Sequence, residues 1–247
     1  MGKKGIYLLP NLLTSGSMFL GFYAILHSFQ RDFGRAAMAI LLAAILDGLD
    51  GRVARLTRTE SRFGVEYDSL ADLISFGVAP AVLAYMWALK PFGRFGWLAA
   101  FLFLACGALR LARFNVQINS VEPSHFVGLP IPSAAGMIAS LVLFIQRLDI
   151  VLVNRSLIIL LLVYVLAFLM VSSIRFYSFK KFDLIRRKPF STLVLAVLGF
   201  VVVVSEPEIM LFAIFCLYIL SGPAIYLHKV LTGRKVEEEE VAEEFLI

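Results

Sequence analysis

The chain has 247 residues, of which 60% are hydrophobic, and its mean hydropathy is +0.86. A water-soluble domain of this size is closer to half apolar, and the excess here lies in long runs. Composition therefore argues against a protein built around one soluble core and predicts a polytopic membrane protein. The formal net charge is +5, but the basic residues gather between apolar runs, as membrane-flanking segments do. We expect membrane lipid as the surroundings and no nucleic-acid partner.

The apolar runs predict an all-α, polytopic membrane helix bundle of about eight spans. In chain order these cover residues 11–29, 34–57, 65–89, 95–117, 128–147, 154–174, 190–205 and 207–228. The seventh is the weakest, because its 16 residues are fewer than the roughly 20 that a helix needs to cross a bilayer. Residues 1–230 are expected to form a single transmembrane domain, and residues 231–247, which are rich in glutamate, an acidic cytoplasmic tail.

Lysine and arginine are divided unequally between the two ends of the predicted spans. Seventeen of the 23 fall on the side that carries the N-terminus, and six fall on the opposite side. Because basic loops stay in the cytoplasm, we expect both termini there and the chain in the cell membrane. The same side carries the ends of the second and third spans, where four aspartates lie.

These four aspartates are the most informative residues of the chain. They stand in the segments Asp47-Gly-Leu-Asp50-Gly51-Arg-Val-Ala54-Arg55 and Gly64-Val-Glu-Tyr-Asp68-Ser-Leu-Ala-Asp72. At i, i+3 and i, i+4 spacing each pair shares one helix face. Acidic groups that border a membrane cost free energy, so their presence indicates a function. Two facing pairs of carboxylates suit hard divalent cations, and the small residues between them let a ligand approach the backbone. The pattern therefore indicates a site for a metal-bound diphosphate.

Two other interpretations of the aspartates stay open at this point. In the first they form buried salt bridges with nearby arginines, namely Arg52, Arg55, Arg58 and Arg62. In the second the chain is an ion-coupled transporter, which predicts acidic residues spread through the membrane depth and paired internal repeats. The acids gather at one end of the spans here, and the sequence contains no evident repeat.

The eight fixed positions of the two segments resemble the signature of the CDP-alcohol phosphotransferase family, membrane enzymes of phospholipid synthesis with a six-helix core. The resemblance implies that Asp47, Asp50 and Asp68 bind two divalent ions, Mg²⁺ or Mn²⁺, that hold the CDP diphosphate. It implies that Asp72 is the general base for the acceptor hydroxyl and a further metal ligand. Residues that border the nucleotide would be Asp47, Gly51, Ala54, Arg55, Gly64 and Asp68. A homodimer is expected from the resemblance alone.

Further stretches resemble the phosphatidylserine synthase branch of this family, which uses CDP-diacylglycerol and L-serine. They are residues 75–81 (SFGVAPA), 108–115 (ALRLARFN) and 126–132 (FVGLPIP), preceded by 10–14 (PNLLT), in which Asn11 and Thr14 are candidate substrate contacts. Arg110 and Arg113 stand at i, i+3, and a guanidinium can bind a carboxylate through two hydrogen bonds, so we expect one of them to hold serine. Asn115 and Ser75 are further candidate serine contacts. Glycerol 3-phosphate or inositol phosphate as acceptor, and an archaeal-type ether lipid as donor, stay open.

Overall fold

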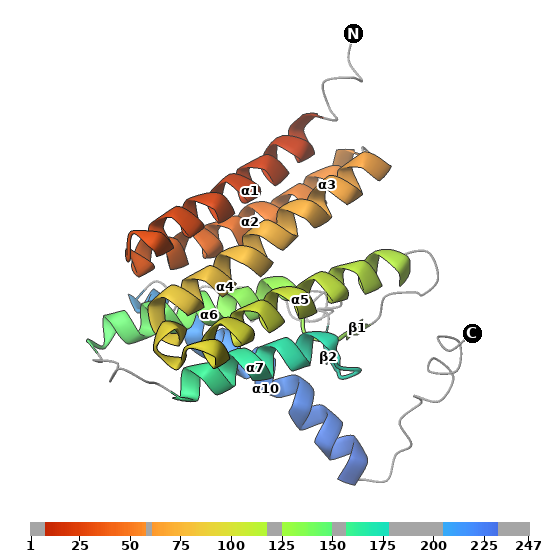
Figure 1. Cartoon of the computed structure of the whole chain (residues 1–247). Helices are drawn as coiled ribbons and strands as arrows, with labels where there is room; N and C mark the ends of the chain where they lie inside the picture. The colour runs from red at the N-terminus through yellow and green to blue at the C-terminus, as the bar shows by residue number, and fades with distance from the viewer. Residues whose placement is uncertain (1–7, 58–60, 118–124, 150–156, 178–204, 232–247) are drawn as a thin grey trace.

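The structure is a computed structural model that describes residues 8–57, 61–117, 125–149, 157–177 and 205–231. Within these residues the fold is helical apart from one short two-stranded ribbon (Figure 1). The α-helices are α1 (Leu8–Phe29), α2 (Phe33–Thr57), α3 (Arg62–Asp72), α4 (Ala79–Ala84), α5 (Arg94–Gln117), α6 (Ile131–Arg147), α7 (Leu157–Val171) and α10 (Pro207–Leu231). Two π-helical segments, η1 (Leu73–Val78) and η2 (Tyr85–Leu89), and one 3-10 turn, η3 (Lys90–Phe92), connect α3 to α4 and α5. Strands β1 (His125–Val127) and β2 (Arg175–Tyr177) pair antiparallel.

Each predicted span that the structure describes overlaps a helix, although residues 128–130 and 172–174 of the fifth and sixth predicted spans are not helical. Four helical stretches are long and apolar enough to cross a membrane: Pro10–Phe29, Arg62–Phe92, Arg94–Val116 and Pro207–Leu227. Helices α6 and α7 are apolar but shorter, and α2 carries charged residues in its second half. These lengths are those of an integral membrane protein. Residues 190–204 of the seventh predicted span and the tail from residue 232 lie outside the described residues, so eight spans and a six-helix core stay predictions.

A tight turn folds α2 back along α1. Arg31 adopts a left-handed backbone conformation with φ of 63°, and the Asp32 amide donates a hydrogen bond to the His27 carbonyl at 2.9 Å. The Asp32 side chain then accepts from the Arg35 amide at 3.2 Å and so caps the first turn of α2. The two helices lie side by side (Figure 1), which brings the start of α1 next to the end of α2, where Asp47 and Asp50 stand.

Helix α3 continues through the π-helical segment η1 into α4 without a break. The widened segment begins directly after Asp72 and precedes Pro80, which has no backbone N–H to donate to the preceding turn. Its backbone also touches α1 closely, since a Cβ added to Gly21 would lie 2.7 Å from the Ser75 Cα atom. This contact fixes α1 against the helix that carries Asp68 and Asp72.

Helix α6 forms the centre of the bundle. Its residues from Ala134 to Ser140 are all buried, and it packs against α2 on one side and α10 on the other. The contacts use small residues: α2 contributes a row of buried alanines, and Gly136 of α6 receives the ring of Phe215 from α10. Small residues of this kind let helices approach closely inside a bilayer, where burying apolar surface supplies little driving force.

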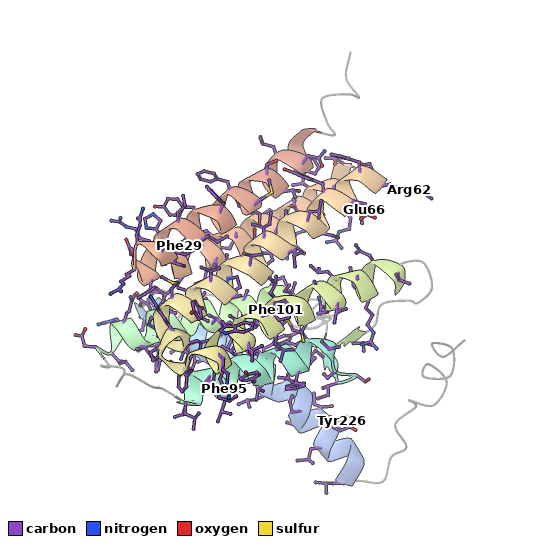
Figure 2. All side chains as sticks on the ribbon, viewed as in Figure 1. Phe29, Arg62, Glu66, Phe95, Phe101 and Tyr226 are labelled. Atoms are coloured by element: carbon purple, nitrogen blue, oxygen red, sulfur yellow. The ribbon has the colours of Figure 1, made fainter. Side chains whose placement is uncertain are left out.

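Large apolar side chains cover the outside of the bundle (Figure 2). Phe29 is 61% exposed, Phe95 55% and Phe101 59%, on helices α1 and α5. Such exposure would favour aggregation in water but suits contact with lipid chains. Arg62 and Glu66 stand at the opposite end of the bundle from Phe29 and Phe95, on the first turns of α3.

The glycine–proline stretch at residues 126–132 connects the ribbon to α6. Gly128 has φ of 78°, its amide donates to the Ile174 carbonyl at 2.9 Å, and a Cβ there would overlap the Met170 carbonyl. Pro130 caps α6 and Pro132 falls in its first turn, where proline is tolerated. Local backbone geometry thus accounts for the glycine and both prolines.

Candidate metal and substrate site

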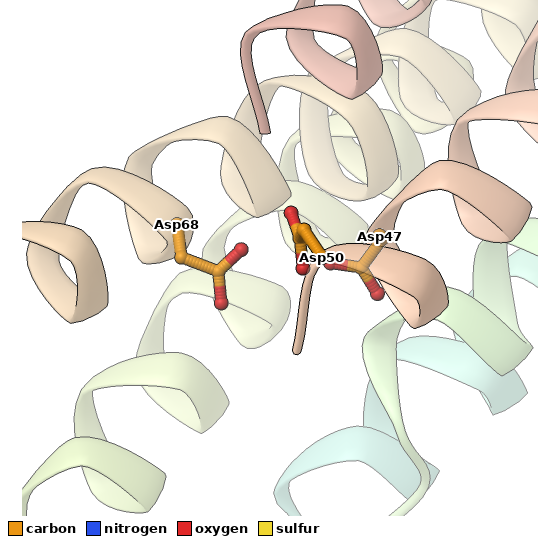
Figure 3. A group of neighbouring side chains, drawn as sticks. All are labelled: Asp47, Asp50 and Asp68. Carbon is orange, nitrogen blue, oxygen red and sulfur yellow. The ribbon is translucent and has the colours of Figure 1, made fainter. Parts of the chain in front are cut away.

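Three of the four predicted aspartates converge between α2 and α3 (Figure 3). Asp47 and Asp50 of α2 and Asp68 of α3 each place one carboxylate oxygen within 4.8 Å of the others. Ligand oxygens around a Mg²⁺ or Ca²⁺ ion stand about 2.0–2.6 Å from the metal, so opposite ligands are separated by roughly 4–5 Å. Asp68 also has one carboxylate oxygen that is buried without a hydrogen-bond partner among the described residues. The donor set and this oxygen both fit a bound divalent cation.

Asp72 joins the same group from the last turn of α3. Its side chain is in hydrogen-bonding contact with that of Asp47. Two carboxyl groups at such a distance repel each other unless a proton or a cation lies between them. The structure therefore brings together all four aspartates of the two sequence segments, and Asp72 is the one that interacts electrostatically with Arg110 of α5.

The salt-bridge interpretation of the aspartates does not hold for the arginines that the structure describes. None of Arg52, Arg55 and Arg62 forms an ion pair with the cluster, and Arg58 lies outside the described residues. Arg55 instead donates from Nε to the carbonyl of Gly51 at 2.9 Å and is exposed to solvent. The charges of the cluster thus have no cationic partner from these three side chains.

Thr14 lies beneath the cluster and holds one of its carboxylates. The Thr14 hydroxyl stands 2.8 Å from Asp50 Oδ2 and 3.1 Å from the Pro10 carbonyl, and the side chain is only 4% exposed. The structure gives Thr14 a contact with Asp50, and the predicted substrate contact of Thr14 stays a prediction. Asn11, one turn earlier, is partly exposed, and its Oδ1 lies 3.6 Å from where a Cβ on Gly64 would stand.

The backbone of α2 is open beside the aspartates. A Cβ added to Gly48 would meet nothing within 4 Å, and one added to Gly51 would meet only an Arg55 guanidinium nitrogen at 4.0 Å. Ala54 is half-buried on the next turn. Gly64 belongs to the first turn of α3, where its amide donates to the Ser61 side chain at 3.0 Å. Of the predicted nucleotide-site residues, those on α2 therefore line an accessible face.

The structure separates the two arginines that the sequence places on one face of α5. Arg110 is buried, with 8% exposure, and its Nε has no hydrogen-bond partner among the described residues. It lies close enough to Asp72 and Tyr218 to interact electrostatically with both. Arg113 reaches the other way, and its guanidinium lies 3.5 Å from the Val171 carbonyl at the end of α7. Only Arg110 is directed toward the aspartates.

Asn115 and Ser75 occupy different surroundings. Asn115 donates from Nδ2 to the Ser69 hydroxyl at 2.9 Å, and Ser69 follows Asp68 on α3, so this contact lies beside the cluster. Ser75 is fully buried and donates to the Ser17 carbonyl at 3.0 Å, which places it in the packing of η1 against α1. Sequence reasoning missed Ser69, although its position next to Asp68 was a signal.

Known proteins match the part of the chain that carries this site. Residues 7–166 match the CDP-alcohol phosphatidyltransferase family, a segment that includes all four aspartates, Arg110 and Arg113. The chain is 46% identical over 176 residues to CDP-diacylglycerol–serine O-phosphatidyltransferase of Helicobacter pylori, covering 71% of this chain and 74% of the relative. The protein of the same name from Bacillus subtilis is 35% identical over 173 residues, 70% of this chain and 92% of the relative. Archaetidylserine synthase of Methanothermobacter thermautotrophicus is 45% identical over 134 residues, 53% of this chain and 56% of the relative. The chain belongs to the CDP-alcohol phosphatidyltransferase family.

Proposed function

We propose that this protein transfers the phosphatidyl group of CDP-diacylglycerol to the hydroxyl of L-serine, giving phosphatidylserine and CMP. The observation that carries the proposal is the convergence of the Asp47, Asp50 and Asp68 carboxylates beside Asp72, in a chain of this family. The names of the Helicobacter pylori and Bacillus subtilis relatives support serine as the acceptor.

The carboxylate cluster is proposed to hold two divalent ions, Mg²⁺ or Mn²⁺. When bound, such ions neutralise the CDP diphosphate and stabilise the charge that develops on departing CMP. Thr14 keeps the Asp50 carboxylate in place through its hydrogen bond. The open backbone at Gly48 and Gly51 leaves room for the nucleotide along α2, with Ala54, Arg55 and Gly64 as its proposed borders.

Asp72 is proposed to take the proton of the serine hydroxyl. The hydroxyl oxygen then forms a bond to the lipid-bearing phosphorus, and the bond from that phosphorus to CMP breaks. A base has to reach the proton within about 2.6–3.2 Å or through one water molecule. Asp72 is in contact with Asp47 and interacts electrostatically with Arg110, so an acceptor held by Arg110 next to the diphosphate would lie near Asp72.

Arg110 is proposed to bind the carboxylate of serine. A buried guanidinium is costly unless its N–H groups are satisfied, and its planar fork matches a carboxylate. The Nε of Arg110, which has no hydrogen-bond partner among the described residues, supports this role, and Asn115 contacts Ser69, the neighbour of Asp68 in the chain. Arg113 and Ser75 are less favourably placed, because the guanidinium of one faces α7 and the hydroxyl of the other is used in packing.

The aspartate end is proposed to face the cytoplasm, together with both termini, as the lysine and arginine distribution predicts. The protein would lie in the cell membrane, take its lipid substrate from that membrane, and associate as a homodimer.

The deciding experiment measures CMP release by the purified chain in detergent with CDP-diacylglycerol and Mn²⁺ or Mg²⁺. L-Serine, glycerol 3-phosphate, inositol phosphate and no acceptor are compared, and CDP-archaeol replaces the diacyl donor in a parallel series. We expect release that depends on serine and falls by roughly 10²- to 10⁴-fold in Asp72→Asn, because the base is lost. Asp149→Asn is the matched control, since Asp149 is exposed at the far end of α6. Release with a phosphorylated acceptor but not with serine would overturn the serine assignment.

Arg110 and Arg113 of α5 allow a second test. Arg110→Gln removes the buried guanidinium, and we expect the KM for serine to rise by about a hundredfold, because truncating a buried charge-pair partner costs several kcal/mol. Arg113→Gln should change it less than about threefold. Wild-type discrimination of serine from serinol, which lacks the carboxylate, should disappear in Arg110→Gln. An unchanged KM and kcat for serine in both variants would sink the carboxylate-binding hypothesis.

A further inference from the structure

Helix α1 carries none of the four aspartates, yet side-chain hydrogen bonds join it to both helices that do. The Thr14 hydroxyl lies 2.8 Å from Asp50 Oδ2 on α2. The next residue, Ser15, has its hydroxyl oxygen 2.8 Å from that of Tyr67 on α3. Tyr67 directly precedes Asp68 in the chain. Two neighbouring residues of α1 therefore reach the α2 half and the α3 half of the aspartate cluster.

The contact between Tyr67 and Ser15 has a defined direction. A serine hydroxyl has one hydrogen to donate, and that of Ser15 goes to the Asn11 carbonyl at 2.8 Å. The Tyr67 hydroxyl is therefore the donor, and Ser15 Oγ accepts. The Tyr67 ring is stacked on that of Phe63, one turn earlier on α3, with ring centroids 5.9 Å apart and 10° between the ring planes. The ring and the hydroxyl of Tyr67 are thus both held.

The two halves of the cluster are supported in different ways. The Asp50 carboxylate is held directly by Thr14, whereas the buried Oδ1 of Asp68 has no hydrogen-bond partner among the described residues. Asp68 faces the carboxylates of α2 from a separate helix (Figure 3). Its direction therefore depends on how α3 is turned about its own axis. A hydrogen bond from the preceding residue, Tyr67, to α1 restricts that rotation.

A second hydrogen bond to α1 lies on the other side of the α3 aspartates. Ser75 of η1 donates to the Ser17 carbonyl at 3.0 Å. Asp68 and Asp72 stand between this contact and the one made by Tyr67. The segment that carries both aspartates is thus attached to α1 before the first and after the second.

We propose that Tyr67 is a positioning residue of the metal site: by donating to Ser15 of α1, it keeps Asp68 at the distance from the α2 carboxylates that a divalent cation requires. The inference rests on the metal site of the proposed function and adds a residue that does not touch the cation. Small divalent ions such as Mg²⁺ accept only a narrow range of ligand distances, so a slight rotation of α3 would weaken binding.

The test compares Tyr67→Phe, which keeps the stacked ring, with the wild-type full-length protein and with Tyr164→Phe. The control loses a hydroxyl that donates to the Phe95 carbonyl at 3.1 Å and joins α7 to α5 at the opposite end of the bundle. Mn²⁺ is titrated into each purified protein without CDP-diacylglycerol, and the free ion is followed by its electron paramagnetic resonance signal. We expect the Kd for Mn²⁺ to rise by about fivefold in Tyr67→Phe, the loss expected for one hydrogen bond, and to change less than about twofold in Tyr164→Phe.

Two further readouts separate positioning from a general loosening of the fold. At saturating Mn²⁺, CMP release by Tyr67→Phe should return to within about twofold of the wild type, because only metal affinity is impaired. Without Mn²⁺ the melting temperatures of Tyr67→Phe and Tyr164→Phe should agree, since each variant loses one hydrogen bond between helices. An unchanged Kd in Tyr67→Phe, an equal rise in the control, or a lower melting temperature for Tyr67→Phe alone would overturn the proposal.

A double-mutant cycle tests the partner. Ser15→Ala removes the acceptor, so Tyr67→Phe should have no further effect on the Kd for Mn²⁺ in that background. Additive effects would contradict the inference. If the wild-type protein binds no Mn²⁺, the proposed metal site fails and this inference fails with it. If the wild type binds Mn²⁺ and Tyr67→Phe binds it equally well, only the role of Tyr67 is lost.

Discussion

The two ends of the helix bundle treat acidic side chains in opposite ways. At the end with the α1–α2 turn, Asp32 lies 3.3 Å from Arg35, and Glu206 before α10 pairs with Arg147 at 3.1 Å. At the other end four aspartates gather, and in the described ranges none of them has an arginine or lysine as an ion-pair partner. Acidic side chains thus pair with arginines at one end and accumulate negative charge at the other. That accumulation suits a cation supplied from outside the chain.

The largest difference between the ends should appear on removing one charge from each. Asp68→Asn keeps the shape of the side chain, and we expect kcat to fall by about a thousandfold, because cation binding supplies several kcal/mol of charge stabilisation. Asp32→Asn keeps the helix cap and should retain activity within about twofold.

A binding measurement accompanies this comparison. Saturating Mn²⁺ should raise the melting temperature of the wild type, since a ligand at 100 times its Kd stabilises by about 2.7 kcal/mol. The same rise is expected in Asp32→Asn but not in Asp68→Asn. An equal rise in both variants would mean that the cation binds elsewhere.

A smaller effect is expected at the support of the cluster. Thr14→Val removes the hydroxyl that contacts Asp50, and we expect the Mn²⁺ concentration for half-maximal activity to rise by about tenfold, as is usual when a ligand loses its supporting hydrogen bond. Thr14→Ser keeps the donor and should resemble the wild type. Ser17→Ala removes another buried hydroxyl of α1, which donates to the Ala43 carbonyl, and serves as the packing control. Equal shifts in Thr14→Val and Ser17→Ala would contradict a specific role for Thr14.

The smallest effect belongs to the opposite end. Glu206→Gln weakens the two-pronged contact with Arg147, in which both atom pairs stand at 3.2 Å. Exposed pairs contribute about 0–1 kcal/mol, so the melting temperature should fall by about 3 °C or less, with the KM for serine unchanged. A raised KM would show that the contact between Glu206 and Arg147 influences serine binding.

Local pattern was sufficient to predict the helices and the aspartate cluster. Apolar runs of membrane-spanning length have few alternatives to helix, because every backbone polar group has to be satisfied within the segment. The i, i+3 and i, i+4 spacing of the aspartates fixes a shared face on each helix before any tertiary contact forms. Because neither acidic face can contact lipid, the aspartates of α2 and those of α3 were expected to face each other.

Contacts between distant residues could not be predicted in this way. Thr14 and Asp50 are 36 positions apart, and neither position alone shows that their side chains meet. The i, i+3 spacing of Arg110 and Arg113 places both on one face of α5. Their guanidinium groups nevertheless reach different neighbours, because α5 lies between α3 and α7. Ser75 belongs to a π-helical segment, and the sequence contains no pattern that predicts its wider turn.

The ribbon of β1 and β2 also gives the molecule an order of assembly in time. All four aspartates lie within the first 72 residues, so their helices are complete early in synthesis, when the N-terminal part of a chain is available first. Phe126 pairs with Phe176 only after α6 and α7 have been made, and Phe176 is one of the residues against which α10 packs. A ribosome that has just finished the aspartate helices has therefore made neither Phe176 nor α10. Of the described elements, α10 is completed last.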